Sequence, residues 1–170
     1  MTADQESTDG RPETEPLLVE IRLVTEHDFP EWLQLRLALW PYHTDEELLV
    51  EMHQIFAVPD STPVFVAVGS GGGILGFAEF SIHESVSWCS TTNVGYVEGW
   101  YVRPECRRSG IGKALLVKGE EWASGRGCTE MASDTTPEYS VSPSAHKGLG
   151  FVEAGDPLHF RKTLSSSYFP

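Results

Sequence analysis

The chain has few basic residues, few cysteines and no long apolar segment. Of its 170 residues, 12 are Lys or Arg and 25 are Asp or Glu, so the formal net charge is -13. Nucleic-acid binding depends on neutralising phosphates, so we expect no nucleic-acid partner. No apolar run reaches the roughly 18 residues of a membrane-spanning helix, so we expect no membrane partner either. An acidic cleft concentrates cationic small molecules, although solubility alone is a sufficient reason for this charge.

The three cysteines form neither a metal-binding nor a disulfide pattern. Cys89, Cys106 and Cys128 lack the spacing of metal ligands, and three thiols cannot all pair. We therefore expect no metal site and a protein of the reducing cytoplasm. The polar N-terminus lacks the apolar core of a secretory signal. Residues 1–16 predict a disordered acidic leader, and residues 17–170 have the length of a single domain.

Apolar periodicity and the Gly and Pro breakers predict strands followed by helices along the chain. Strands are expected at 17–24, 63–68, 74–82, 96–102 and 128–133, with a closing pair between 151 and 163. Helices are expected to begin near residues 28, 44, 111 and 140, and residues 85–93 are expected to form a polar loop. This order predicts an α/β (mixed α+β) fold, with a mixed sheet of six to seven strands and helices on both faces.

The stretch from residue 96 to residue 117 predicts a strand, a basic glycine turn and a helix. A helix N-terminus with unpaired N–H groups, nearby glycines and flanking arginines binds an anion such as a pyrophosphate. The turn is not a P-loop, because Ala114 occupies the place of the Ser or Thr that would hold magnesium. It is not a dinucleotide fingerprint either, because that motif needs three glycines at other spacings.

Two carboxylates belong to the predicted strands at 96–102 and 128–133, one inside the first of these strands and one directly after the second. Glu98 lies within an apolar strand, where burying a carboxylate without a partner is costly, and this favours a functional role. Asp134 closes the next strand, although an Asp there also caps turns. Gly99 indicates a bulge in the strand at 96–102, which contains Glu98. If the strands are neighbours, both carboxylates line one cleft, where they bind an ammonium group and accept its proton.

The pattern Arg107-x-x-Gly110-x-Gly112 after an apolar strand, together with Leu149-Gly150-Phe151, resembles the GCN5-related N-acetyltransferase (GNAT) superfamily. The resemblance implies the GNAT fold with its splayed sheet, and acetyl-CoA as co-substrate. It places the pyrophosphate on seven consecutive residues: Arg107, Arg108, Ser109, Gly110, Ile111, Gly112 and Lys113. It also implies that the backbone of Trp100, Tyr101 and Val102 pairs with the pantetheine arm, while their side chains serve only the core.

Within that superfamily, residues 21–164 resemble the aminoglycoside 6′-N-acetyltransferases of type I. The motifs are Trp32-Leu-x-Leu-Arg36-x-x-Leu-Trp40, Glu51-Met52-His53, Glu98-Gly99-x-Tyr101-Val102-x-Pro104, Arg107-Arg108-Ser109-Gly110, Glu121-Trp122-Ala123, Cys128-Thr-Glu-x-Ala-Ser-Asp134 and His146-x-x-Leu-Gly-Phe151. The resemblance implies acetyl transfer to the 6′-amine of the antibiotic in a ternary complex. It assigns substrate contacts to Trp40, His43 and the acidic pair Glu98 and Asp134. Without it, Trp40 is equally well a core residue and His43 a solvated loop residue.

The chain departs from the family pattern at several positions. A family tyrosine before the central strand falls on Ser85 or Val86, so Trp88 or Tyr96 is the alternative aromatic wall. A family asparagine is replaced by Tyr139, and a family glutamate falls on Gly155.

His146 occupies the place of the tyrosine that many superfamily members use as thiolate acid. It is therefore a candidate catalytic acid, or a residue that only packs. The resemblance also implies a homodimer, in which Phe160–Leu164 is an edge strand covered by a second subunit. Two other functions stay open, namely acetylation of another small cationic or protein amine, and CoA binding without turnover.

Overall fold

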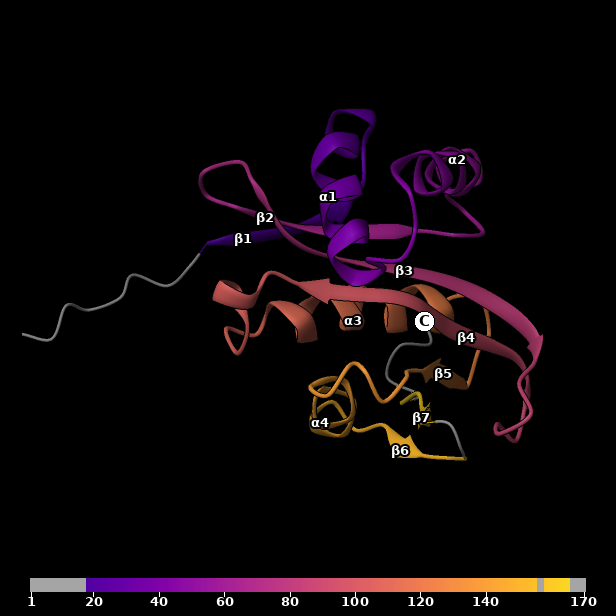
Figure 1. The fold of residues 1–170 in the computed structure, drawn as a ribbon. Coiled ribbons are helices and arrows are strands. Elements are labelled where there is room, and N and C mark those ends of the chain that lie inside the picture. The colour runs from indigo at the N-terminus through magenta and orange to yellow at the C-terminus, as the bar shows by residue number, and fades with distance from the viewer. Residues whose placement is uncertain (1–17, 156–157, 166–170) are drawn as a thin grey trace, which may run out of the picture.

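The computed structural model describes residues 18–155 and 158–165 (Figure 1). The predicted leader, residues 1–16, lies outside these ranges. The strands are β1 (Val19–Leu23), β2 (Val64–Gly69), β3 (Ile74–Ser85), β4 (Thr92–Val102), β5 (Glu130–Asp134), β6 (Val152–Glu153) and β7 (His159–Thr163). The helices are α1 (Phe29–Leu39), α2 (Asp45–Phe56), α3 (Ile111–Ser124) and α4 (Ser142–Gly148), with 3-10 turns at Glu26–Asp28 and Pro104–Cys106.

The strands form one seven-stranded sheet in the order β1-β2-β3-β4-β5-β7-β6. The β4–β5 pair is parallel, and the other pairs are antiparallel. Short turns join β2 to β3 and β3 to β4, whereas the segment that contains α1 and α2 connects β1 to β2. Helix α3 carries the chain from β4 to its parallel neighbour β5. The predicted mixed sheet is confirmed.

Alternation along β3 divides the core between the two faces of the sheet. Phe77 packs with Trp32 of α1 and Met52 of α2, while Phe80 packs on the opposite face with Leu115 of α3. All five side chains are almost fully buried, and each such burial contributes about 1.5–3 kcal/mol. In Figure 1, α1 and α2 lie on one side of the sheet and α4 on the other. Helices on both faces are therefore confirmed.

The predicted start of α2 is a capping box. The Thr44 hydroxyl accepts from the Glu47 amide at 3.3 Å, and the Glu47 carboxylate accepts from the Thr44 amide at 2.9 Å. These two bonds satisfy groups that a helix end leaves unpaired.

The hairpin of β3 and β4 is longer than the sequence predicts. Ladder pairs continue to His83 with Val94 and Ser85 with Thr92, so the loop spans only residues 86–91. The expected loop at 85–93 was wrong at both ends, because backbone pairing continues through these polar residues.

The C-terminal strand is not a sheet edge. β7 lies between β5 and β6, and the two-residue β6 forms that edge of the described sheet. The prediction that residues 160–164 form an edge strand was therefore wrong. β6 and β7 are antiparallel, and β6, the first strand of the closing pair, is the outer one.

The sheet forks between β4 and β5. These strands pair only at Gly95 with Met131, Tyr96 with Ala132, and Val97 with Ser133. β4 continues to Val102 along β3, so from residue 98 onward it has no partner on its β5 side within the described chain. The splayed sheet that the family resemblance implies is confirmed.

No helix in the described ranges is long and apolar enough to span a membrane. Cys89, Cys106 and Cys128 are all free thiols.

Candidate active site

A β-bulge sets the position of Glu98. Glu79 pairs with Gly99, and the next residue, Phe80, pairs with Val97, so Glu98 is an extra residue in β4. The predicted bulge is confirmed. The Glu98 side chain is 41% exposed, so the expected burial cost was wrong: the bulge turns this carboxylate toward solvent.

The two candidate carboxylates stand at the fork of the sheet. Val97 and Ser133 form the last β4–β5 pair, and Glu98 and Asp134 are the next residues on the two strands. Ser81 pairs with Tyr96 across the β3–β4 ladder, and paired residues share a face of a sheet. Ser81 donates to Glu98 and Tyr96 donates to Asp134, so both carboxylates lie on the face that carries α1.

One oxygen of Glu98 is held by two neighbours on β3. The Ser81 hydroxyl donates to Oε1, and His83 Nε2 lies 2.7 Å from the same atom. Oε2 has no hydrogen-bond partner among residues 18–155 and 158–165. One oxygen is thus fixed, and the other is open to a ligand.

Tyr96 holds Asp134 from the neighbouring strand. Burial raises the pKa of the Tyr96 phenol, and the bond to Asp134 raises it further. The phenol therefore stays protonated and donates at any physiological pH. Asp134 is itself exposed, so its second oxygen is accessible.

Aromatic rings form a row beside these acids. His83 stacks on Tyr96 with centroids 4.2 Å apart, and Trp88 stacks on His159 at 3.7 Å. Trp88 meets Tyr96 edge-on at 6.4 Å, which joins the two stacks. Both candidates for the missing family tyrosine, Trp88 and Tyr96, lie in this row.

Trp40 lies next to Glu98, whereas His43 does not contact either acid in the described structure. A Cβ at Gly99 would lie 2.6 Å from the Trp40 ring, so the indole rests on the bulge. His43 is half-exposed, and its Nδ1 lies 3.8 Å from a Glu47 oxygen.

A buried ion pair supports Trp40. The Arg36 guanidinium lies 4.8 Å from the Trp40 ring, and its Nε lies 3.2 Å from a Glu79 oxygen. Trp32 Nε1 donates to the same oxygen at 2.9 Å. Burial raises the pKa of Glu79 to about 7, although Arg36 and Trp32 both favour its charged form.

The turn that was predicted to bind an anion lies at the start of α3, on the other face of the sheet. Gly110 is the N-cap with φ +88°, a left-handed conformation that favours glycine. Gly112 is needed for packing, because a Cβ there would lie 2.8 Å from the Trp100 ring. Glycine is therefore required at Gly110 by the backbone conformation and at Gly112 by packing.

The turn presents amides and cations together. Ala114 N bonds back to the Gly110 carbonyl, so the amides of Ile111, Gly112 and Lys113 precede the first such bond of α3. Arg108 and Lys113 are exposed. Arg107 is instead tied to β4, because its Nε donates to the Val102 carbonyl at 3.0 Å and its guanidinium lies 5.5 Å from the Tyr101 ring.

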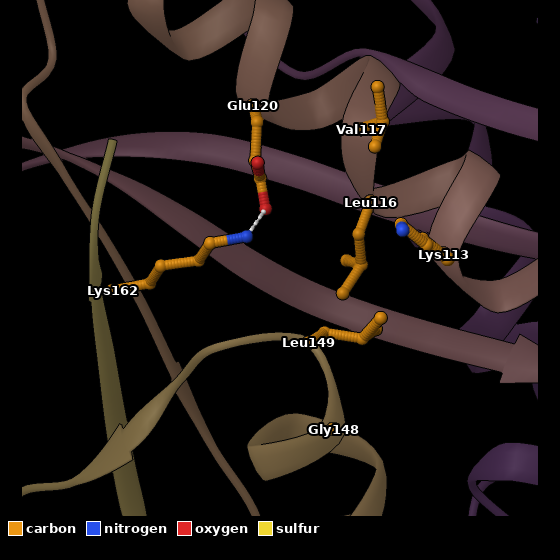
Figure 2. Close-up of a pocket in the computed structure, with 7 residues that line it drawn as sticks. All are labelled: Lys113, Leu116, Val117, Glu120, Gly148, Leu149 and Lys162. Carbon is orange, nitrogen blue, oxygen red and sulfur yellow. Dashed lines mark hydrogen bonds and ion pairs between the residues drawn. The ribbon is translucent and has the colours of Figure 1, made fainter. Parts of the chain in front are cut away.

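A cavity of about 220 Å³ continues from this turn between α3 and the end of α4. Figure 2 shows its lining residues: Lys113, Leu116, Val117, Glu120, Gly148, Leu149 and Lys162. Lys162 donates to the buried Glu120, so its charge is compensated. The cavity does not reach Glu98 or Asp134, which lie on the opposite face.

His146 is buried, and both of its ring nitrogens are engaged. Nε2 lies 2.9 Å from the Ser133 hydroxyl, and Nδ1 lies 2.9 Å from the Ser142 carbonyl. The ring stacks on Phe160 at 4.3 Å. Burial lowers the pKa of His146, which favours the neutral ring. Its role as thiolate acid stays a prediction, and this geometry favours packing.

Sequence reasoning missed three side chains on the same face as the two carboxylates: Ser81, His83 and His159. Ser81 and His83 are two residues apart on a strand, which puts them on one face. The two-residue spacing is visible in the sequence, but only the register of the β3–β4 ladder shows that Ser81 and His83 lie against Glu98. His159 pairs with Asp134 across β5 and β7, and no local motif indicates this.

The described residues contain no group of three or more His, Cys, Asp or Glu side chains arranged to hold a metal ion.

Residues 29–151 match the model of the acetyltransferase (GNAT) family. A type 1 aminoglycoside N(6′)-acetyltransferase from Klebsiella aerogenes is 44% identical over 146 residues, covering 85% of this chain and 96% of that protein. Another from Stenotrophomonas maltophilia is 39% identical over 148 residues, covering 86% and 95%.

Solved structures agree with these sequence matches. AAC(6′)-Iy in complex with the bisubstrate analogue CoA-S-monomethyl-acetylneamine superposes with a TM-score of 0.76 at 34% identity, covering 83% of this chain and 95% of that one. The same enzyme with CoA gives a TM-score of 0.78 at 34% identity, covering 85% and 95%. The forked sheet, the amide-rich turn and these likenesses agree: the chain belongs to the GNAT acetyltransferase family, within the type 1 aminoglycoside N(6′)-acetyltransferases.

Proposed function

We propose that this protein transfers the acetyl group of acetyl-CoA to the 6′-amine of aminoglycoside antibiotics. The observation that supports this most strongly is the placement of Glu98 and Asp134 as the first residues past the last β4–β5 pair. An anionic co-substrate is favoured on one face of the fork, and a cationic acceptor on the other.

The acetyl-CoA half is assigned to β4 and the turn before α3. The amides at the α3 N-terminus and the exposed Arg108 and Lys113 suit a pyrophosphate. The backbone of residues 100–102, on the β5 side that no strand covers, suits the extended pantetheine arm. The thioester then lies in the fork.

The acceptor half is assigned to the α1 face. Glu98 and Asp134 each have one oxygen held by a neighbour, which leaves the other oxygen for an ammonium group. Trp40 and the ring row flank these acids and suit the apolar faces of aminosugar rings. His43, whose amide donates to the Trp40 carbonyl at 3.2 Å, is assigned to the outer part of a large acceptor.

The reaction needs no covalent enzyme intermediate. The ammonium loses a proton to a carboxylate, directly or through water, and the free amine attacks the thioester carbonyl. The carbon–sulfur bond breaks, the thiolate takes up a proton, and the products are an amide and free CoA. Holding both substrates at the fork supplies the orientation that this step requires.

A thiol-release assay tests the proposal. Purified protein with acetyl-CoA should release CoA in the presence of kanamycin or tobramycin, which carry a 6′-amine. It should release none with an aminoglycoside that has a 6′-hydroxyl instead. Turnover only with spermidine or with a peptide amine would assign a different acceptor, and no turnover with any amine would leave a CoA-binding module.

We further infer that the protein works in the cytoplasm, where acetyl-CoA is available, and as a homodimer. The apolar side chain of Val152, which is 55% exposed on the outer strand β6, supports the dimer, because a second subunit would cover it. Light scattering of the purified protein measures the assembly directly, and a monomer mass contradicts it.

A further inference from the structure

His83 contacts the acceptor carboxylate but belongs to none of the motifs that identified the site. Its Nε2 lies 2.7 Å from Glu98 Oε1, and Ser81 donates to the same oxygen. The side chains of His83 and Glu98 are 40% and 41% exposed, so the pair is accessible to a charged acceptor.

The His83 ring is also connected to the second carboxylate. It stacks on Tyr96 at 4.2 Å with planes 19° apart, and Tyr96 donates to Asp134. The titratable groups that face His83 are therefore Glu98 and Tyr96 on β4, with Asp134 on β5 behind the phenol. One stacked pair of rings holds both acids, each by a single oxygen.

We propose that His83 is a positioning residue that turns Glu98 so that Oε2 faces the acceptor ammonium. This inference rests on the proposed function. Donation from Nε2 fixes Oε1 and leaves Oε2 to the acceptor. Loss of this donor leaves Oε1 bound by Ser81 alone among the described residues, so the carboxylate is less firmly oriented.

Two substitutions separate these contributions. His83→Phe keeps a ring to stack on Tyr96 and removes the donor, whereas His83→Gln keeps a donor and removes the ring. Glu84→Gln is the matched control, because Glu84 is the exposed neighbour on the same strand. Each protein is assayed with tobramycin and acetyl-CoA at pH 8, and each is checked by thermal unfolding.

At pH 8, we expect H83F to raise the KM for tobramycin about tenfold, the scale of one hydrogen bond to a charged group. The KM for acetyl-CoA should not change, and H83Q should stay near the wild type.

An unchanged KM in H83F, or a KM raised as much in H83Q as in H83F, would overturn the inference. No turnover by the wild type would overturn the proposed function instead. In that case, calorimetric binding of tobramycin by the three proteins measures the same ratios, and equal affinities in all of them remove His83 from the site.

Discussion

The proposed acetyl-CoA turn is made from consecutive residues, 107–113. The proposed acceptor face instead takes its side chains from β3, β4, β5, β7, the β3–β4 loop and the end of α1. The turn depends on local conformation, such as the left-handed Gly110. The acceptor face depends on ladder register and on one bulge. A local motif is visible in a sequence, while an assembled face requires the tertiary structure. A substitution in the turn should therefore weaken acetyl-CoA binding alone, and a substitution on the acceptor face should weaken acceptor binding alone.

The largest effect on activity is expected at Glu98. Replacing it in E98Q keeps the shape and removes the charge and the base. We expect kcat/KM for tobramycin to fall about a hundredfold, as for loss of a general base. Acetyl-CoA affinity, measured by calorimetry, should not change. A comparable loss of acetyl-CoA affinity would show that the two halves are not separate.

Gly112→Val should produce the opposite pattern. The new Cβ would lie 2.8 Å from the Trp100 ring, so the start of α3 must shift, at a cost of about 1–3 kcal/mol for overpacking. We expect weaker acetyl-CoA binding by calorimetry and a lower melting temperature. Gly71→Ala is the control, because no atom lies within 4 Å of its Cβ. Wild-type acetyl-CoA affinity in G112V would argue that the turn does not bind the co-substrate.

A smaller effect is expected at Tyr96. Y96F keeps the ring that stacks on His83 and removes the donor to Asp134. The loss of one hydrogen bond to a carboxylate predicts about a tenfold fall in kcat/KM for the aminoglycoside. Steady-state kinetics at saturating acetyl-CoA measure it. If Y96F matches the wild type, Asp134 does not need its partner.

The smallest effect on activity is expected far from both halves. The Arg22 hydrogen bond lowers the pKa of Asp28 from 3.8 to about 2. The stabilisation is present above the unfolded pKa and is lost as the pH falls from about 4 toward 2. D28N should lower the unfolding free energy at pH 7 by about 2 kcal/mol and leave kcat/KM unchanged.

Urea denaturation at pH 7 and pH 3 checks this prediction, with D60N as an exposed control. The difference between D28N and the wild type should shrink at the lower pH. An equal difference at both values would mean that the Asp28 charge is not its source.

Sequence reasoning predicted the fold and the turn because their signals are local. The breakers around residues 103–112 and the Thr44 capping box each act within a few residues. The acceptor face was predicted only in part. Glu98 was expected to be buried because it lies in an apolar strand. Its exposure depends on where the bulge falls in the β3–β4 ladder, and the apolar alternation of the sequence does not reveal that position.

Other errors had the same physical origin. His83 was missed because it lies on β3 and contacts Glu98 on the neighbouring strand β4. Residues 160–164 were placed at an edge because chain order does not reveal that β6 lies outside β7. Pairing between strands decides each of these positions, and pairing is not a property of any single segment.

The fork also has a consequence for how the protein withstands heat. Backbone groups of β4 beyond residue 97 lack a β5 partner, and a ligand that pairs with them stabilises only the native state. The melting temperature should therefore climb with acetyl-CoA concentration. In a cell depleted of the metabolite, this chain would unfold more readily and become easier for proteases to degrade.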